Sequence, residues 1–140
     1  MNRNLEFIAV VIAGALALAA CGNGQSEAAG ATGVRLVSPA DAAAIANQAP
    51  DRLVILDIRT PEEFNSGHLQ GATLLNFYEP DFAERLAELE TGVPYLLYCR
   101  SGNRSGQTAE LMTDLGFTDV AEVDGGIVAW EASGLALLAP

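Results

Sequence analysis

A cysteine, Cys99, lies where an apolar segment gives way to a short polar segment that contains two arginines. Residues 94–98 read Pro-Tyr-Leu-Leu-Tyr, and residues 99–105 read Cys-Arg-Ser-Gly-Asn-Arg-Ser. Positive surroundings and a helix N-terminus lower the pKa of a thiol from about 8.5 to about 3.5–7.5, which leaves much of it as thiolate at neutral pH. We therefore expect Cys99 to act as a thiolate nucleophile. The other candidate residues of this loop are Arg100, Ser101, Gly102, Asn103, Arg104 and Ser105.

A strand and a helix are predicted on either side of the loop. Residues 94–98 have the composition of a buried strand. Beyond Ser105 the apolar residues have a helical spacing that ends at Gly116. The first N–H groups of a helix lack intrahelical partners and carry the positive end of its dipole, and Gly102 lets the chain curl so that its N–H groups point inward. The loop is therefore predicted to hold a negatively charged sulfur.

The rest of the chain alternates between predicted strands and predicted helices. The strands are expected at 34–37, 53–56, 72–75, 94–98 and 120–123, and the helices at 38–48, 60–67, 81–90 and 105–116. Ser38 and Thr60 each precede a proline and then an acid, as N-cap residues do. This alternation predicts an α/β fold with a mostly parallel central sheet and helices on both faces. In such sheets ligands bind beyond the carboxyl ends of the strands, where Asp57, Arg59 and Cys99 would gather.

Four segments, in this order along the chain, resemble the signatures of the rhodanese sulfurtransferases. Residues 57–64 are similar to Asp-x-Arg with Glu-Phe, residues 67–72 to Gly-His-Ile-x-Gly-Ala, residues 99–105 to Cys-x-x-Gly-x-Arg-Ser/Thr, and residues 125–130 to Gly-Gly-x-x-x-Trp. The resemblance spans about 34–137 and implies a rhodanese-like fold. It also implies transfer of a sulfane sulfur through a Cys99 persulfide, without a cofactor. The donor would be a small anion such as thiosulfate, or a persulfide, and the acceptor cyanide, a thiol or a thioredoxin-like protein.

The resemblance also implies roles for the residues around the thiol. Arg104 either binds an anionic substrate or braces the loop by pairing with Asp57, and the resemblance favours bracing. Arg100 is expected at the pocket opening, where it would attract thiosulfate. Asp57 and Arg59 are supporting residues, and Arg59 could equally be a surface or structural base. His68 falls in a structural turn away from the thiol. Core packing is expected of Phe117, Ile127 and Trp130.

Two other functions compete with sulfur transfer. Thiolate phosphatases and arsenate reductases have five residues between their cysteine and arginine, whereas four separate Cys99 from Arg104. A non-catalytic module that senses sulfur or binds a protein is the other alternative, but inactive members of the family usually lack the cysteine. With a single histidine in the chain, a transition-metal site is poorly supported.

The N-terminal segment has the pattern of an export signal. A short n-region with Arg3 precedes an apolar run at 7–18, and residues 18–21, Leu-Ala-Ala-Cys, resemble the lipobox of bacterial lipoproteins. This pattern predicts a signal peptide at 1–20, lipidation of Cys21, a flexible tether over 21–33 and a domain over 34–140. An ordinary signal cleaved near Ala20, or an uncleaved anchor, is the alternative. We expect a membrane-anchored protein of the bacterial envelope, periplasmic or at the cell surface.

The chain is acidic, which bears on its partners. Its 140 residues carry seven arginines or lysines against eighteen acids, a formal net charge of -11. Such a charge argues against nucleic acid or an anionic membrane surface as a partner. The length suits one domain of about 100 residues and a leader, and we expect a monomer.

Overall fold

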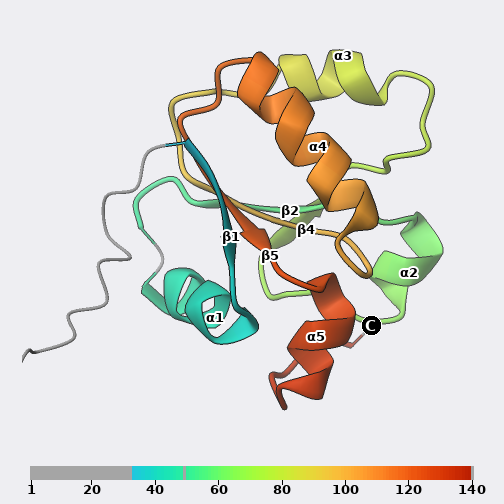
Figure 1. Ribbon diagram of the computed structural model, residues 1–140. Helices are drawn as coiled ribbons and strands as arrows, with labels where there is room; N and C mark the ends of the chain where they lie inside the picture. Colours follow the sequence, from blue (N-terminus) through green and yellow to red (C-terminus); the bar gives the residue numbers. More distant parts are fainter. Residues whose placement is uncertain (1–32, 49, 140) are drawn as a thin grey trace, which may run out of the picture.

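Parallel strands form one sheet at the centre of the part that the computed structural model describes, residues 33–48 and 50–139 (Figure 1). Within this part the sheet has five strands in the order β1-β5-β4-β2-β3, and every neighbouring pair is parallel. The strands are β1 Gly33–Val37, β2 Val54–Asp57, β3 Ala72–Leu74, β4 Tyr95–Tyr98 and β5 Asp119–Val123. The helices are α1 Pro39–Gln48, α2 Pro61–Asn65, α3 Phe82–Ala87, α4 Asn103–Asp114 and α5 Gly126–Ala132.

The central strand β4 is buried along its whole length. Successive strand side chains point to opposite faces, so Tyr95 and Leu97 enter one hydrophobic cluster while Leu96 and Tyr98 enter the other. The apolar run at 94–98 is therefore a buried strand, as predicted, and its side chains pack on both faces of the sheet.

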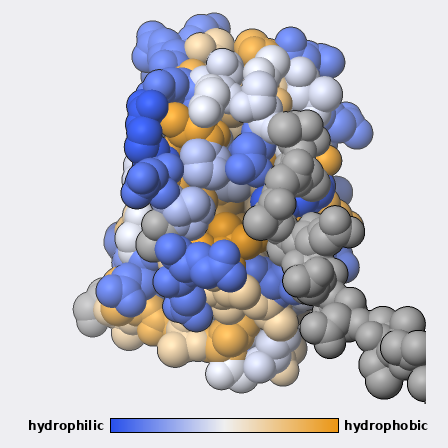
Figure 2. Space-filling view, turned by 90° about the vertical axis from the view of Figure 1, so that its left-hand side faces the viewer, coloured by the Kyte–Doolittle hydropathy of each residue, from blue (hydrophilic) through white to orange (hydrophobic). Residues whose placement is uncertain are grey.

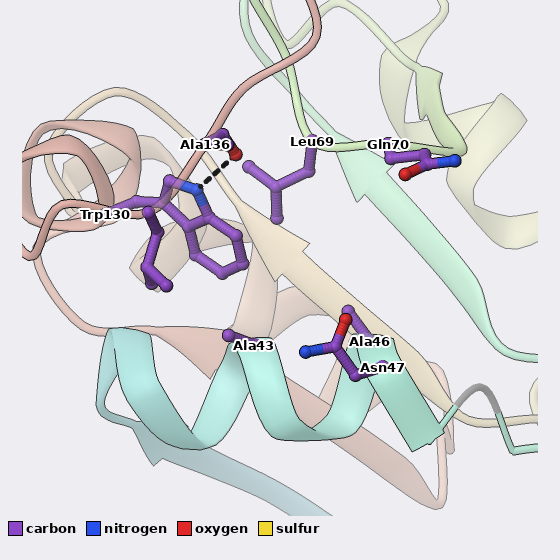
Figure 3. A pocket seen from close by; sticks show the side chains of 8 residues that line it. Ala43, Ala46, Asn47, Leu69, Gln70, Trp130 and Ala136 are labelled. Carbon is purple, nitrogen blue, oxygen red and sulfur yellow. Dashed lines mark hydrogen bonds between the residues drawn. The ribbon is translucent and has the colours of Figure 1, made fainter.

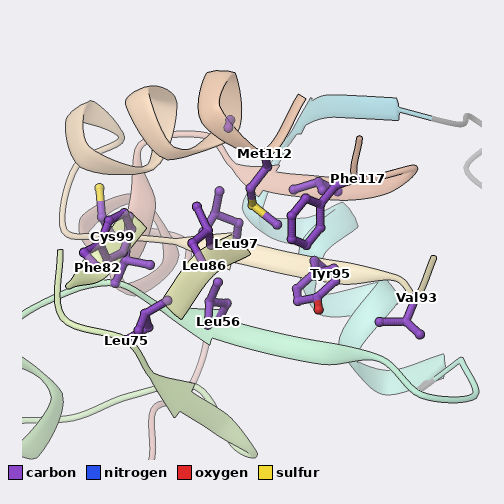
Figure 4. Close-up of a cluster of buried hydrophobic side chains, with 13 residues drawn as sticks. Leu56, Leu75, Phe82, Leu86, Val93, Tyr95, Leu97, Cys99, Met112 and Phe117 are labelled. Carbon is purple, nitrogen blue, oxygen red and sulfur yellow. The ribbon is translucent and has the colours of Figure 1, made fainter. Parts of the chain in front are cut away.

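Helices cover both faces of the sheet (Figure 1). On one face α3 contributes Leu86 and α4 contributes Met112 to the same cluster as Leu97, as Figure 4 shows. On the other face α1 contributes Ala42 and α5 contributes Trp130. The predicted architecture, a parallel sheet between helices, is confirmed, and so is core packing for Phe117, Ile127 and Trp130.

Side-chain caps start the first two helices where the sequence predicts them. The Ser38 hydroxyl accepts the Asp41 backbone N–H at 3.1 Å before α1. Thr60 forms a complete capping box with Glu63, in which each backbone N–H is accepted by the other side chain. These caps satisfy N–H groups that the first turn would otherwise leave unpaired.

Three elements differ from the prediction. Helix α4 begins at Asn103, before Ser105, because Gly102 takes a left-handed conformation with φ 98° and is itself the N-cap. Helix α3 is shorter than the predicted 81–90, since Glu88 ends it. Helix α5, Gly126–Ala132, was not predicted, because the two glycines at its start indicate only a turn.

The surface mixes polar and apolar side chains. On the side that holds β1 and α1, hydrophilic areas are interrupted by hydrophobic ones (Figure 2). In the described ranges no helix is both long and apolar enough to cross a membrane. The predicted signal peptide and the Cys21 lipidation site lie outside these ranges, as does the tether apart from Gly33, which is the first residue of β1.

Candidate active site

Cys99 is the first residue after β4, at the carboxyl end of the central strand. Its sulfur points toward the start of α4 (Figure 4) and accepts the Gly102 backbone N–H at 3.1 Å. The Sγ atom lies 3.4 Å from the Ser105 hydroxyl oxygen. The conformation of Gly102 that starts α4 thus turns the loop's N–H groups toward the sulfur, as predicted.

Hydrogen bonds control the ionisation of the thiol. Burial by itself raises the pKa of Cys99, which is only 1% exposed. The Ser105 hydroxyl and the backbone N–H groups of Ser105, Gly102 and Ser101 stabilise the thiolate and outweigh that effect, so the pKa is lowered. A lowered pKa for Cys99 agrees with the sequence prediction, and the hydrogen bonds within the loop are the main cause that lowers it.

The start of α5 fixes the backbone of the thiol loop. The Ile127 N–H donates to the Cys99 carbonyl at 2.9 Å, and the Val128 N–H donates to the Arg100 carbonyl at 3.1 Å. The approach is close enough to require glycine at Gly126, where φ is +60° and a Cβ would lie 2.5 Å from the Cys99 carbonyl oxygen. The Gly-Gly pair therefore positions the loop.

Asp57 and Arg59 form a buried pair below the loop. The Arg59 guanidinium donates to both Asp57 oxygens, with its Nη2 at 2.7 Å from Oδ2, and also to the Gly67 carbonyl at 2.7 Å. The Tyr98 hydroxyl donates to Asp57 Oδ2 at 2.6 Å. Burial raises the pKa of Tyr98, and the charge of Asp57 adds to this effect. The contacts of both predicted supporting residues thus join β2, β4 and the turn after α2.

The predicted pairing of Arg104 with Asp57 is wrong, because Arg104 pairs with Glu63. Its guanidinium donates to both Glu63 carboxylate oxygens, at 2.8 and 2.7 Å, and lies over the Tyr78 ring at 5.4 Å. The reason is geometric: Arg104 is in the first turn of α4 and meets α2, while the oxygens of Asp57 are occupied by Arg59 and Tyr98. The hydrogen bond from Arg104 is the main cause that lowers the pKa of Glu63 to about 2.

Glu122, a residue of β5, lies next to the thiol loop and was not predicted from the sequence. The Ser105 hydroxyl donates to its Oε1 at 2.7 Å, and the side chain is buried. Burial is the main cause that raises the pKa of Glu122. A sequence signal was present, since Glu122 is the one acid in the predicted strand 120–123, and a buried acid requires a partner.

The remaining predicted residues lie at the edge of the site. Arg100, Ser101 and Asn103 are exposed, and the Asn103 side chain accepts a hydrogen bond from Gln107 at 3.1 Å. His68 lies apart from the loop: its ring stacks on Phe64 at 3.8 Å and its Nδ1 is 3.0 Å from the Phe64 carbonyl. His68 thus lies in the turn after α2 and contacts Phe64, as expected for a residue of a structural turn.

A separate pocket of about 330 Å³ lies between α1 and α5 on the opposite face of the sheet (Figure 3). None of the thiol loop lines it. Its wall consists of Ala43, Ala46, Asn47, Leu69, Gln70, Trp130, Leu135 and Ala136.

In the part of the chain that the structure describes, no group of three His, Cys, Asp or Glu side chains is arranged to hold a metal ion.

Comparisons with known proteins agree on one domain type. The model of the rhodanese-like domain matches residues 38–133. The chain is 36% identical over 81 residues to thiosulfate sulfurtransferase GlpE of Pseudoalteromonas translucida, covering 58% of this chain and 75% of that protein. It is 39% identical over 80 residues to GlpE of Pseudomonas putida, covering 57% and 71%. The solved structure of a rhodanese-related protein from Thermoplasma volcanium matches with a TM-score of 0.66 at 25% identity, covering 76% of this chain and 99% of that one.

Proposed function

The chain belongs to the rhodanese-like domain family, and from this membership we propose that it is a sulfurtransferase that carries a sulfane sulfur on Cys99. The observation that supports this most directly is the thiol itself. Its sulfur faces the Gly102 N–H and the Ser105 hydroxyl, and its pKa is lowered by them against the effect of burial. A ring of donors around one sulfur stabilises both a thiolate and the persulfide that replaces it.

The proposed reaction has two steps. In the first, the Cys99 thiolate attacks the outer sulfur of thiosulfate, the bond between the two sulfurs of the donor breaks, and sulfite leaves with the electron pair. In the second, an acceptor such as cyanide, a small thiol or a thioredoxin-like protein attacks the outer sulfur of the persulfide. The Cys99 thiolate is then regenerated. Neither step requires a resident cofactor, and the kinetics should be ping-pong.

The two arginines of the loop have different parts in this proposal. Arg100 is exposed, so it attracts the anionic donor to the loop. Arg104 is held by both oxygens of Glu63, so it braces the loop. The same contact disfavours a phosphatase or arsenate reductase, because those enzymes direct the arginine of the loop at the oxyanion.

We also propose that the domain works outside the cytoplasm, anchored through a lipid on Cys21. The support is the lipobox pattern at residues 18–21. Labelling with a radioactive fatty acid in a bacterial host tests it. The intact chain should incorporate label and Cys21→Ser should not, while label in both, or in neither, would contradict the proposal.

The sulfur transfer is tested by intact mass spectrometry of the full chain carrying Cys21→Ser, so that Cys99 is its only thiol. Thiosulfate should add the mass of one sulfur atom, cyanide should remove it, and the same chain with Cys99→Ser should gain nothing. No gain with thiosulfate or with polysulfide would reject the proposal. Phosphate and arsenate esters, and then protein partners, would become the substrates to examine.

A further inference from the structure

Glu122 is a buried acid behind the thiol loop that the proposed sulfur transfer does not use. It lies on β5 with 8% of its surface exposed, and it meets the first turn of α4 through Ser105, which is fully buried. Gly106 of α4 lies beside it, since a Cβ on Gly106 would be in van der Waals contact with Glu122 Oε1 at 3.8 Å. Three side chains from β5, α4 and the end of β4 thus form a continuous line, Glu122, Ser105 and Cys99.

Ser105 has one hydroxyl proton and two partners that compete for it. The Ser105 oxygen is 2.7 Å from Glu122 Oε1 and 3.4 Å from Cys99 Sγ. When Glu122 is a carboxylate, the hydroxyl donates to it and can only accept a proton from the thiol. When Glu122 is protonated, it donates to the Ser105 oxygen and releases the hydroxyl to donate to a thiolate. The ionisation states of Glu122 and Cys99 are therefore coupled through this hydroxyl.

We propose that Glu122 receives the proton of the Cys99 thiol through the hydroxyl of Ser105. The S–H proton moves to the Ser105 oxygen as the Ser105 proton moves to Glu122 Oε1. The products are a thiolate, an unchanged serine hydroxyl and a neutral carboxyl, so that no proton is gained or lost. Glu122 does not touch the sulfur and acts only through Ser105. This step rests on the proposed sulfur transfer and would form the thiolate that begins it.

The surroundings of Glu122 favour a proton on it. The groups that face it from the packed elements are the Ser105 hydroxyl and Gly106 of α4, and its register partners Leu97 of β4 and Leu36 of β1. All of these groups are neutral. Burial, and after it the negative charge of Asp124, raise the pKa of Glu122, while the pKa of Cys99 is lowered. The two groups are thereby brought closer in proton affinity, which is the condition for sharing one proton.

The test measures both groups over pH in the full chain with Cys21→Ser. The rate of Cys99 alkylation by iodoacetamide reports the thiolate, and the infrared carbonyl band of a neutral carboxyl reports protonated Glu122. Coupled groups titrate in two shared steps. Glu122→Gln should leave one alkylation step, with a midpoint about one pH unit or more below the upper step of the parent. Cys99→Ala should lower the midpoint for loss of the carboxyl band by a similar amount, because the coupling is reciprocal.

Ser105→Ala separates a proton path from simple charge repulsion. In that background Glu122→Gln should shift the alkylation midpoint much less than it does with Ser105 present. The proposal is overturned if Glu122→Gln does not move the alkylation midpoint, or moves it equally with and without the Ser105 hydroxyl. It is also overturned if Cys99→Ala does not change the pH at which the carboxyl band is lost. Because neither readout uses a sulfur donor, a failure of sulfur transfer leaves this result standing, and the reverse also holds.

Discussion

Neutralising Glu63 should destabilise the domain by an amount that depends on pH. The carboxylate of Glu63 accepts two hydrogen bonds from Arg104 and one from the Thr60 N–H. Its pKa is lowered from 4.5 to about 2, with the Arg104 hydrogen bond as the main cause. At about 1.4 kcal/mol for each tenfold change in proton affinity, this sets an upper limit of about 3.5 kcal/mol. Solvent reaches the site, because 26% of the Glu63 side chain is exposed, so we expect Glu63→Gln to cost about 1–2 kcal/mol at pH 7.

The sign of the pH effect follows from the lowered pKa. Stability that comes from a depressed carboxyl pKa is complete above the unfolded value, near 4.5, and is lost as the pH falls toward about 2. The free energies of unfolding of the parent and of Glu63→Gln should therefore differ fully at pH 7 and converge between about pH 4.5 and 2. Urea unfolding across this range, followed by circular dichroism, measures the difference.

Glu62→Gln is the matched control. Glu62 is exposed in the same first turn of α2, and replacing it removes the same charge from the same helix N-terminus without touching Arg104. It should cost less than about 0.5 kcal/mol. An equal loss of unfolding free energy in the two variants would contradict this role of the Glu63–Arg104 pair. A difference between the parent and Glu63→Gln that is as large at pH 2 as at pH 7 would contradict it as well.

Three further changes test the other contacts of the site. Gly126→Ala should lower the free energy of unfolding in urea by more than about 2 kcal/mol and slow Cys99 alkylation, because a Cβ there would lie 2.5 Å from a backbone oxygen of the loop. The control Gly134→Ala, at a glycine with φ +75° and open space around it, should lower the free energy of unfolding by only about 1 kcal/mol. Tyr98→Phe removes the hydroxyl that donates to buried Asp57 and should cost about 1–3 kcal/mol in urea unfolding, and no loss would mean that the carboxylate finds another donor. His68→Gln should leave the rate of sulfur transfer within about twofold across pH 5–8, and a tenfold loss would contradict its structural assignment.

The fold was predictable because its signals are local. A short apolar run that contains two tyrosines and follows a proline, such as that of β4, favours a buried strand, and the caps at Ser38 and Thr60 define where α1 and α2 begin. The start of α5 was missed for a physical reason. Gly126 reads as a turn residue, whereas its lack of a Cβ serves the approach of a helix to the Cys99 carbonyl, a contact between segments distant in the sequence.

The site was predictable only in part, because ion pairs depend on the tertiary structure. The loop sequence was enough to predict donors around the sulfur of Cys99 and a lowered pKa. It could not assign two acids to two arginines, since Asp57 and Glu63 are each close in sequence to Arg59 and both precede Arg104 by a long interval. The assignment is decided by the depth at which each acid lies: Asp57 is fully buried at the end of β2, and Glu63 is partly exposed.

This assignment has a chemical consequence for the loop. Because Glu63 occupies the guanidinium of Arg104 through both of its oxygens, the donors left to face the sulfur are the N–H groups of the loop, with the Ser105 hydroxyl oxygen beside them. Such donors, close around one atom, suit a single added sulfur, whereas the guanidinium fork that would bind two phosphate oxygens at once is held by Glu63. Under the proposed function, the Glu63–Arg104 pair between α2 and α4 would favour sulfur transfer over phosphate binding, because Arg104 is then not free to bind the substrate. If that is correct, Glu63→Gln, which frees Arg104, should increase inhibition by inorganic phosphate, whereas Glu62→Gln should not.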